Sequence, residues 1–364
     1  MTVAHKPHKT APMRTYGRRR QLAYIFYIMK QLLLPCCLLL SSHCVSAQSD
    51  HLLKVYGEVR MDYQRDYRDG TAHNPNSGFK GKYLNFELDG KIVDALTWHY
   101  RQRLNKAHKD QSLFDATDWA YLAWQANSRW SVSAGKQPVN IGSFEYERTP
   151  IDMYFSSEFW YNIPCFTFGV NVSYTPNDGK DLLTAQVCES PFNTPDGDMY
   201  AYGLAWTGKH GILNTVYTAN MTEYKPGKMI WYVALGHQLT FGKSRLQLDI
   251  MNRAAQGHAF LFKDVSVIAE WRHTLSKKCA VMAKMTYEAN TTDSDADPCV
   301  YAGTELTRLG AGVEYYPVGN NQNVRLHANA CYSYGKNSNP NGTVQPRQLM
   351  INTGLTWKVT LMKL

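Results

Sequence analysis

One repeated pattern constrains the fold of this chain more than any other: stretches of about ten residues in which apolar and polar side chains alternate. In the first stretch, Val55, Val59 and Met61 alternate with Glu58 and Arg60. A period of two is typical of a β-strand with one apolar and one polar face, because successive side chains point to opposite faces. No helical period competes with it, so the sequence predicts an all-β fold.

The number and spacing of these stretches indicate a membrane barrel. About sixteen of them follow one another in residues 48–364, which leaves about 20 residues for each strand and its connection and suits tilted strands that cross a bilayer. The connections alternate between short turns and longer segments, of which 139–163 is the longest. The short turns are predicted at 126–128, 176–180, 208–211, 241–243 and 319–321. We therefore expect a transmembrane antiparallel β-barrel of about 16 strands, with 139–163 as its third external loop.

A secreted β-sandwich also has alternating strands, and the two folds differ in where the aromatic residues lie. The aromatic residues fall mostly at the ends of the apolar faces, as the interfacial girdles of a membrane barrel require. They include Trp98, Trp124, Trp206, Trp271 and Trp357. The opposite face carries charged residues too regularly for a sandwich core, so the pattern favours the membrane barrel.

The net charge of +9 suggests a nucleic-acid partner until its position along the chain is considered. Residues 1–47 hold seven of the 39 basic residues and no acidic residue, so residues 48–364 carry a net charge of only +2. The segment is basic, then apolar from Leu32 to Leu40, and ends in Val45-Ser46-Ala47. This order is typical of a signal peptide. We expect residues 1–47 to be a signal peptide, residues 48–364 to be the barrel, and no nucleic-acid partner.

Several segments resemble the phosphate-selective porin O and P family of Gram-negative outer membranes. The segments that carry the resemblance are Val55–Arg60, Gly81–Gly90, Tyr100–Lys106, Ser133–Pro138, Pro150–Asp152, Gly303–Arg308 and Gly354–Lys358. The resemblance implies a homotrimeric porin of sixteen strands in outer-membrane lipid, which takes up small hydrophilic solutes or ions. It also implies that the third external loop folds inward and narrows the pore.

Charges of both signs are expected at the narrowest part of the lumen. The strands supply basic residues on one side, and loop 139–163 supplies mainly carboxylates that face them. The candidate residues are Arg60, Arg101 and Arg103 on the strands and Glu145, Glu147, Arg148, Asp152 and Glu158 on the loop. Because this loop has one arginine, four carboxylates and no lysine, the anion selectivity of the family is not expected to carry over.

Two other functions stay open. A barrel-wall enzyme would need a serine and a histidine together on a lipid-facing strand edge, and the strand pattern does not bring such a pair together. A structural or adhesive barrel would lack conductance. No cofactor and no metal ion is expected: Asp293, Asp295 and Asp297 have the spacing of a Ca²⁺ loop, but Pro298 replaces the turn glycine. Whether any of Cys165, Cys188, Cys279, Cys299 and Cys331 pair is left open.

Overall fold

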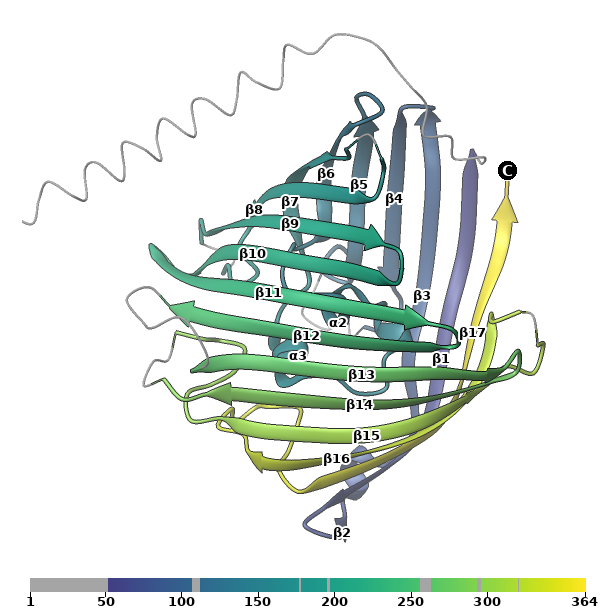
Figure 1. Ribbon diagram of the computed structural model, residues 1–364, viewed down its shortest axis with the longest axis vertical. Helices are drawn as coiled ribbons and strands as arrows, with labels where there is room; N and C mark the ends of the chain where they lie inside the picture. The colour runs from purple at the N-terminus through teal and green to yellow at the C-terminus, as the bar shows by residue number, and fades with distance from the viewer. Residues whose placement is uncertain are drawn as a thin grey trace, which may run out of the picture. The chain divides into compact units, whose positions relative to one another are not determined.

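The computed structural model describes residues 52–106, 112–176, 178–194, 197–255, 263–292, 296–319 and 321–364, which form one antiparallel sheet (Figure 1). The predicted signal peptide, residues 1–47, lies outside the described residues. None of the helices in the described part of the chain is long and apolar enough to span a membrane.

Sixteen long strands follow one another around the sheet, and each pairs antiparallel with its neighbours in the chain. They are β1 (Leu53–Arg68), β3 (Gly78–Val93), β4 (Leu96–Arg103), β5 (Thr117–Gln125), β6 (Trp130–Pro138), β7 (Phe166–Tyr174), β8 (Asp181–Glu189), β9 (Tyr200–His210), β10 (Leu213–Lys225), β11 (Lys228–Phe241), β12 (Ser244–Ala255), β13 (Asp264–Ser276), β14 (Cys279–Asn290), β15 (Glu305–Tyr315), β16 (Val324–Lys336) and β17 (Gln348–Lys363). The two-residue β2 (Thr71–Ala72) extends the β1–β3 connection.

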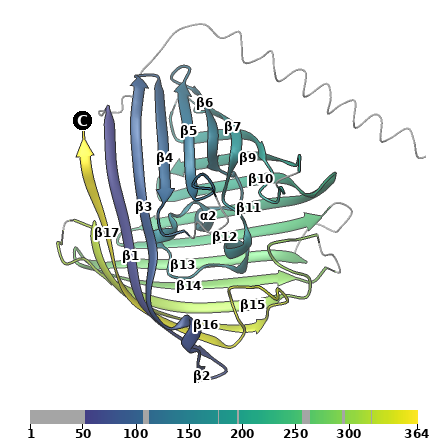
Figure 2. The same cartoon turned by 180° about the vertical axis from the view of Figure 1, so that it is seen from behind.

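The sheet closes on itself because the last strand pairs with the first. The register of β17 against β1 runs from Lys54↔Lys363 to Arg68↔Gln348, and both strands lie side by side in Figure 2. Closure gives every edge strand a partner, which removes the unpaired backbone groups that lipid could not satisfy. The predicted closed barrel of about 16 strands is confirmed.

Short and long connections lie at opposite ends of the barrel. One end, the turn end, carries short connections such as 94–95, 242–243 and 277–278, together with Leu364. The other, the loop end, carries the longer segments, including 69–77, 139–165 and 337–347. The turn predicted at 208–211 is shorter in the structure, because β9 continues to His210.

Alternation along the strands places apolar side chains outside and polar side chains inside. On β1, Met61 and Tyr63 are exposed on the outer face, whereas Glu58, Arg60 and Asp62 are buried within the barrel. The aromatic residues of the outer face cluster near its two ends, where a bilayer has its interfaces. Such a strand therefore has an apolar face suited to lipid and a polar face suited to the lumen, as its sequence indicates.

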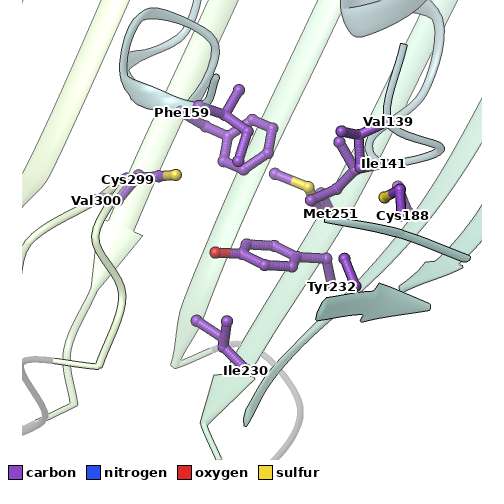
Figure 3. Packing of buried hydrophobic residues seen from close by; sticks show 12 residues of the cluster. Val139, Ile141, Phe159, Cys188, Ile230, Tyr232, Met251, Cys299 and Val300 are labelled. Carbon is purple, nitrogen blue, oxygen red and sulfur yellow. The ribbon is translucent and has the colours of Figure 1, made fainter. Parts of the chain in front are cut away.

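One part of the inner wall departs from this rule. Cys188, Ile230, Tyr232, Ala234 and Met251 point inward and form an apolar cluster with residues of two loops, shown in Figure 3. Residues 230–235 are apolar on both faces of β11, which is typical of a strand that is covered on both sides. This patch of the inner face is apolar because loop residues rather than water cover it.

Candidate functional site: the lumen and the segment 139–165

Segment 139–165 joins β6 to β7 and is the longest connection of the barrel. It contains α2 (Phe144–Glu147), the short 3₁₀-helix η2 (Pro150–Asp152) and α3 (Glu158–Asn162). Figure 1 shows α2 and α3, and Figure 2 shows α2, on the inner side of the sheet. Its side chains contact strands β11 to β17 and β1, so the segment crosses the lumen from one wall toward another.

Apolar packing holds the two ends of the segment against the inner wall. Val139 and Ile141 at its start and Phe159 and Ile163 near its end are all buried in the inner cluster. The Phe159 ring lies 5.7 Å from that of Tyr232 on β11. Burial of four large apolar side chains away from water explains why the segment lies on this wall.

Two glycines of the wall make room for the segment. A Cβ atom at Gly236 of β11 would overlap the Ser143 hydroxyl, and one at Gly310 of β15 would lie 2.5 Å from the Phe155 ring. A glycine inside a strand often marks a close approach by another part of the chain. These two positions therefore define where the segment lies against the barrel.

Polar contacts hold the first half of the segment around Glu145. The Lys284 ammonium on β14 lies 2.6 Å from the Glu145 carboxylate, which also accepts a hydrogen bond from the Ser157 hydroxyl at 2.5 Å. Asp249 on β12 accepts hydrogen bonds from the Ser143 hydroxyl and from the backbone N–H of Glu145. Glu145 is consequently a buried, fully paired residue and not a free charge of the lumen.

Arg148 continues this set of contacts toward the next strand. Its guanidinium lies 2.5 Å from the Glu270 carboxylate of β13 and donates a second hydrogen bond to Gln247 of β12 at 3.1 Å. The arginine thus neutralises a buried carboxylate of the wall while part of its own surface stays exposed.

The second half of the segment lies against β15 to β17 and β1. Asp152 lies 2.9 Å from Arg325 on β16 and 3.4 Å from Lys358 on β17. Arg60 on β1 pairs with Asp62 at 2.7 Å and donates hydrogen bonds to the backbone carbonyls of Ile151 and Met153. Arg60 therefore holds the backbone of the segment rather than facing its carboxylates.

Arg101 and Arg103 lie on β4, away from these contacts. Arg101 lies 3.4 Å from Glu87 and 3.3 Å from Asp118, and Arg103 lies 3.0 Å from Asp118. Neither forms an ion pair with Glu145 or with another carboxylate of segment 139–165 among the described residues. The expected basic group of three strand arginines is thus divided between two different sets of partners.

Glu158 lies at the start of α3 and has no access to the lumen, since it is fully buried. Its carboxylate accepts hydrogen bonds from the side-chain amides of Asn162 at 2.8 Å and of Asn339, in the loop before β17, at 3.4 Å. The residue connects two loops. Its buried carboxylate is positioned as a structural group, and its part in the constriction stays a prediction.

Glu147, at the end of α2, is the loop carboxylate that remains free. Its side chain is exposed and forms no ion pair among the residues that the structure describes. Protein surrounds it on several sides, and this partial burial raises the pKa of its carboxyl above the usual range. Of the four carboxylates predicted to face the pore, Glu147 alone presents an unpaired negative charge.

In several ion pairs of the wall the cation reaches the solvent and the carboxylate lies behind it, whereas Arg101, Arg253 and Lys284 are as buried as their partners. The side chain of Arg245 is 37% exposed while that of its partner Glu270 is 4% exposed. Lys358 is 34% exposed and its partner Glu58 is 5% exposed. At these two pairs solutes in the lumen meet the positive side chain first, although the charges of the lumen nearly balance.

The remaining candidate groups give no catalytic or metal site among the described residues. The five cysteines of the barrel are all unpaired. Asp293 and Asp295 of the acidic loop lie outside the described residues, whereas Asp297 forms an ion pair with Arg253 at 2.6 Å. No group of three or more possible metal ligands occurs in the described part of the chain.

One expectation about a barrel-wall enzyme was wrong. Ser244 of β12 and His273 of β13 lie opposite each other, and the serine hydroxyl lies 2.7 Å from the Nδ1 atom of the histidine. Both occupy outward positions near the turn end, where Trp271 stacks on the imidazole. No carboxylate forms an ion pair with His273 within the described ranges, so the third member of a catalytic triad is lacking.

Comparisons with known proteins agree with this geometry. The profile of a family described as phosphate-selective porin O and P matches residues 53–225. No curated protein matches the chain. The family match confirms the resemblance over residues 53–225.

Solved structures show the same fold at low sequence identity. An anion-selective porin from Comamonas acidovorans matches with a TM-score of 0.60 and 11% identity, over 84% of this chain and 99% of its own. The outer membrane channel DcaP of Acinetobacter baumannii has the same TM-score and identity, over 87% of this chain and 100% of its own. The trimer form of OmpT from Vibrio cholerae matches with a TM-score of 0.58 and 13% identity, over 84% and 99% of the two chains.

Proposed function

We propose that this chain, a porin of the phosphate-selective porin O and P family by its residues 53–225, lets small hydrophilic solutes and ions diffuse passively across the outer membrane. The observation that carries this function is the closed barrel with an apolar outer face and a charged inner face, crossed by segment 139–165. An outward apolar band fits lipid, and an inner wall of charged groups keeps water and polar solutes in the lumen. The loop end is then external and the turn end periplasmic.

Segment 139–165 is proposed to narrow the pore. Its ion pairs with β13, β14 and β16 and its apolar contacts with β11 hold it across the lumen. A segment fixed on so many sides keeps a constant pore diameter, which is what a size-selective filter requires.

The exposed charges support a weak preference for anions. Three of the four loop carboxylates are paired or fully buried, and Arg245 and Lys358 of the wall are more exposed than their partner carboxylates. The count of acidic residues in the loop therefore overstates the negative potential of the lumen. Glu147 is the residue that opposes the preference, because its charge is exposed and unpaired.

Further expectations about the mature protein belong to the same proposal. Residues 1–47 act as the signal peptide that directs the chain to the outer membrane, where residues 48–364 form the barrel. A homotrimer is expected from the family resemblance, and OmpT, which shares the fold, has a trimer form. No cofactor and no catalytic residue are needed for diffusion through a pore.

Liposome swelling tests the proposal directly. Vesicles that contain the purified barrel should swell in solutions of small neutral sugars, and the rate should fall steeply with solute size. Deletion of residues 144–162, which removes α2 and α3, should admit larger solutes. Swelling that is independent of the protein would contradict a transport role, and an unchanged size limit would contradict a constriction by this segment.

A further inference from the structure

The outer face of the barrel has a groove at its external end that the proposed transport function does not use. The groove has a volume of about 720 Å³ and lies over β1, β16 and β17. Its walls combine aromatic, aliphatic and charged side chains, unlike the apolar surface below it. The lining residues are Tyr67, Asp69, Gly70, Tyr332, Arg347, Leu349 and Ile351.

Arg65 lies beside this groove on the lipid-facing side of β1. It pairs in register with Ile351, and its neighbours in the alternation, Met61 and Tyr63, are exposed on the outer face. Its guanidinium lies 5.9 Å from the centre of the Tyr67 ring and forms no ion pair among the described residues. A cation on the lipid face of a barrel is tolerated near the membrane interface, where it can reach a headgroup.

Arg347 is fixed at the external edge of the same groove. Its Nε atom lies 2.6 Å from the Asp69 carboxylate, and the backbone N–H of Asp69 donates to the Arg347 carbonyl at 3.1 Å. Both residues have left-handed backbone conformations, with φ of 50° and 51°, which only a few non-glycine residues adopt. The contact orients the guanidinium and leaves its terminal nitrogens as donors without a hydrogen-bond partner in the described ranges.

The rest of the external rim carries charges of both signs, with exposed cations such as Lys225 at the end of β10 and Lys336 at the end of β16. Glu189, Glu223 and Glu305 occupy outward positions at the external ends of β8, β10 and β15. An anionic headgroup would be repelled by these positions and attracted to the side that carries Arg65 and Arg347. Two arginines beside one groove, rather than the sign of the rim as a whole, therefore mark this site.

We propose that the groove over β1, β16 and β17 binds an outer-leaflet lipid with a phosphate-bearing headgroup. Arg65 and the terminal nitrogens of Arg347 bind the phosphate oxygens, because a guanidinium matches the geometry of phosphate. Tyr67 and Tyr332 flank the sugar or glycerol part of the headgroup, and an acyl chain lies along Leu349 and Ile351. The site fixes individual lipids to one side of the barrel and is separate from the pore.

Native mass spectrometry of the detergent-purified barrel can test this site. The probes are the phosphorylated glycolipid lipid A and the same glycolipid after removal of its phosphates. The double variant Arg65→Gln, Arg347→Gln is compared with Lys228→Gln, which removes an exposed cation at the external end of β11, far from the groove in the sheet order. Heat-modifiable migration in gels and single-channel conductance establish that each variant has folded.

The wild type and Lys228→Gln should retain lipid A, and the double variant should bind it at least about tenfold more weakly, since it loses two charge-assisted contacts. Removal of the phosphates should weaken binding to the wild type to a similar extent. Equal retention by the double variant, or equal retention of the dephosphorylated lipid, would overturn the proposal. A third result would also overturn the proposal: the wild type retains no lipid, and copies of the chain cross-link to one another through β1 and β17. A second copy of the chain would then cover the groove.

Discussion

The substitution Glu147→Gln removes the one free carboxylate of segment 139–165 and leaves the contacts that hold the segment unchanged. The side chain is exposed and unpaired within the described residues, so the substitution removes a charge and breaks no ion pair. In a salt gradient, we expect the reversal potential to move toward the equilibrium potential of the anion. The conductance should change little, because the amide has nearly the same volume as the carboxylate.

The size of this effect follows from the position of the charge. A unit charge acts on an ion about 4 Å away with about 1 kcal/mol in a medium like water. Since RT is about 0.59 kcal/mol, this energy changes the local concentration of either ion by at most about fivefold, in opposite directions for cations and anions. Salt at 0.1 M screens charges over about 10 Å, so the shift should shrink as the salt concentration rises.

Planar-bilayer recordings of Glu147→Gln, with Glu305→Gln as the matched control, provide the assay. Glu305 is also exposed but lies on the outer face of β15, outside the lumen, so its loss should leave selectivity unchanged. Equal reversal potentials for wild type and Glu147→Gln would refute the assignment of Glu147 to the permeation path.

The wild type should also respond to pH through the same residue. Partial burial raises the pKa of Glu147, so its carboxylate takes up a proton at a higher pH than an ordinary glutamate does. Protonation removes the negative charge. Acidification should therefore shift selectivity toward anions in the wild type, and this component of the shift should be absent from Glu147→Gln.

Three further substitutions test how segment 139–165 is held. Lys284→Met leaves the buried Glu145 carboxylate unpaired at a cost of about 3–5 kcal/mol, so segment 139–165 should become sensitive to protease. A second substitution, Glu145→Gln, removes the unpaired charge and should restore much of the resistance to protease. Gly236→Ala places a methyl group against Ser143 and should displace the segment, raising the conductance while the barrel stays heat-modifiable. Tyr232→Ala opens a cavity in the inner apolar cluster at a cost of about 3–5 kcal/mol, which should also appear as faster proteolysis at residues 139–165. Protection equal to that of the wild type in Lys284→Met and Tyr232→Ala would show that neither residue holds the segment.

The strands and their orientation could be predicted from the sequence because each residue of a barrel strand faces either lipid or lumen. That choice is local, and it is visible as the alternation of residues such as Met61 and Asp62. The inner apolar patch escaped prediction because it depends on a segment distant in sequence. A signal was present in residues 230–235, which are apolar on both faces of one strand.

The partners of the charged residues could not be predicted for a related reason. Alternation predicts that Lys284 points inward, but its contact with Glu145 joins residues that are 139 positions apart and depends on how the loop folds. Lys358 was not among the predicted inward charges, although it pairs with Glu58 and Asp152. Paired and free carboxylates look alike in a sequence, and only the three-dimensional contacts separate Glu147 from Glu145.

Single-channel recording of the purified wild-type barrel in a planar bilayer is the most direct test of the central claim, a water-filled pore in which Arg245 and Lys358 are more exposed than their partner carboxylates. We expect discrete conductance steps that increase with salt concentration and a reversal potential displaced modestly toward the anion. A barrel that inserts without conductance steps would contradict the pore, and a clear preference for cations would contradict the arrangement of charges proposed for its lumen.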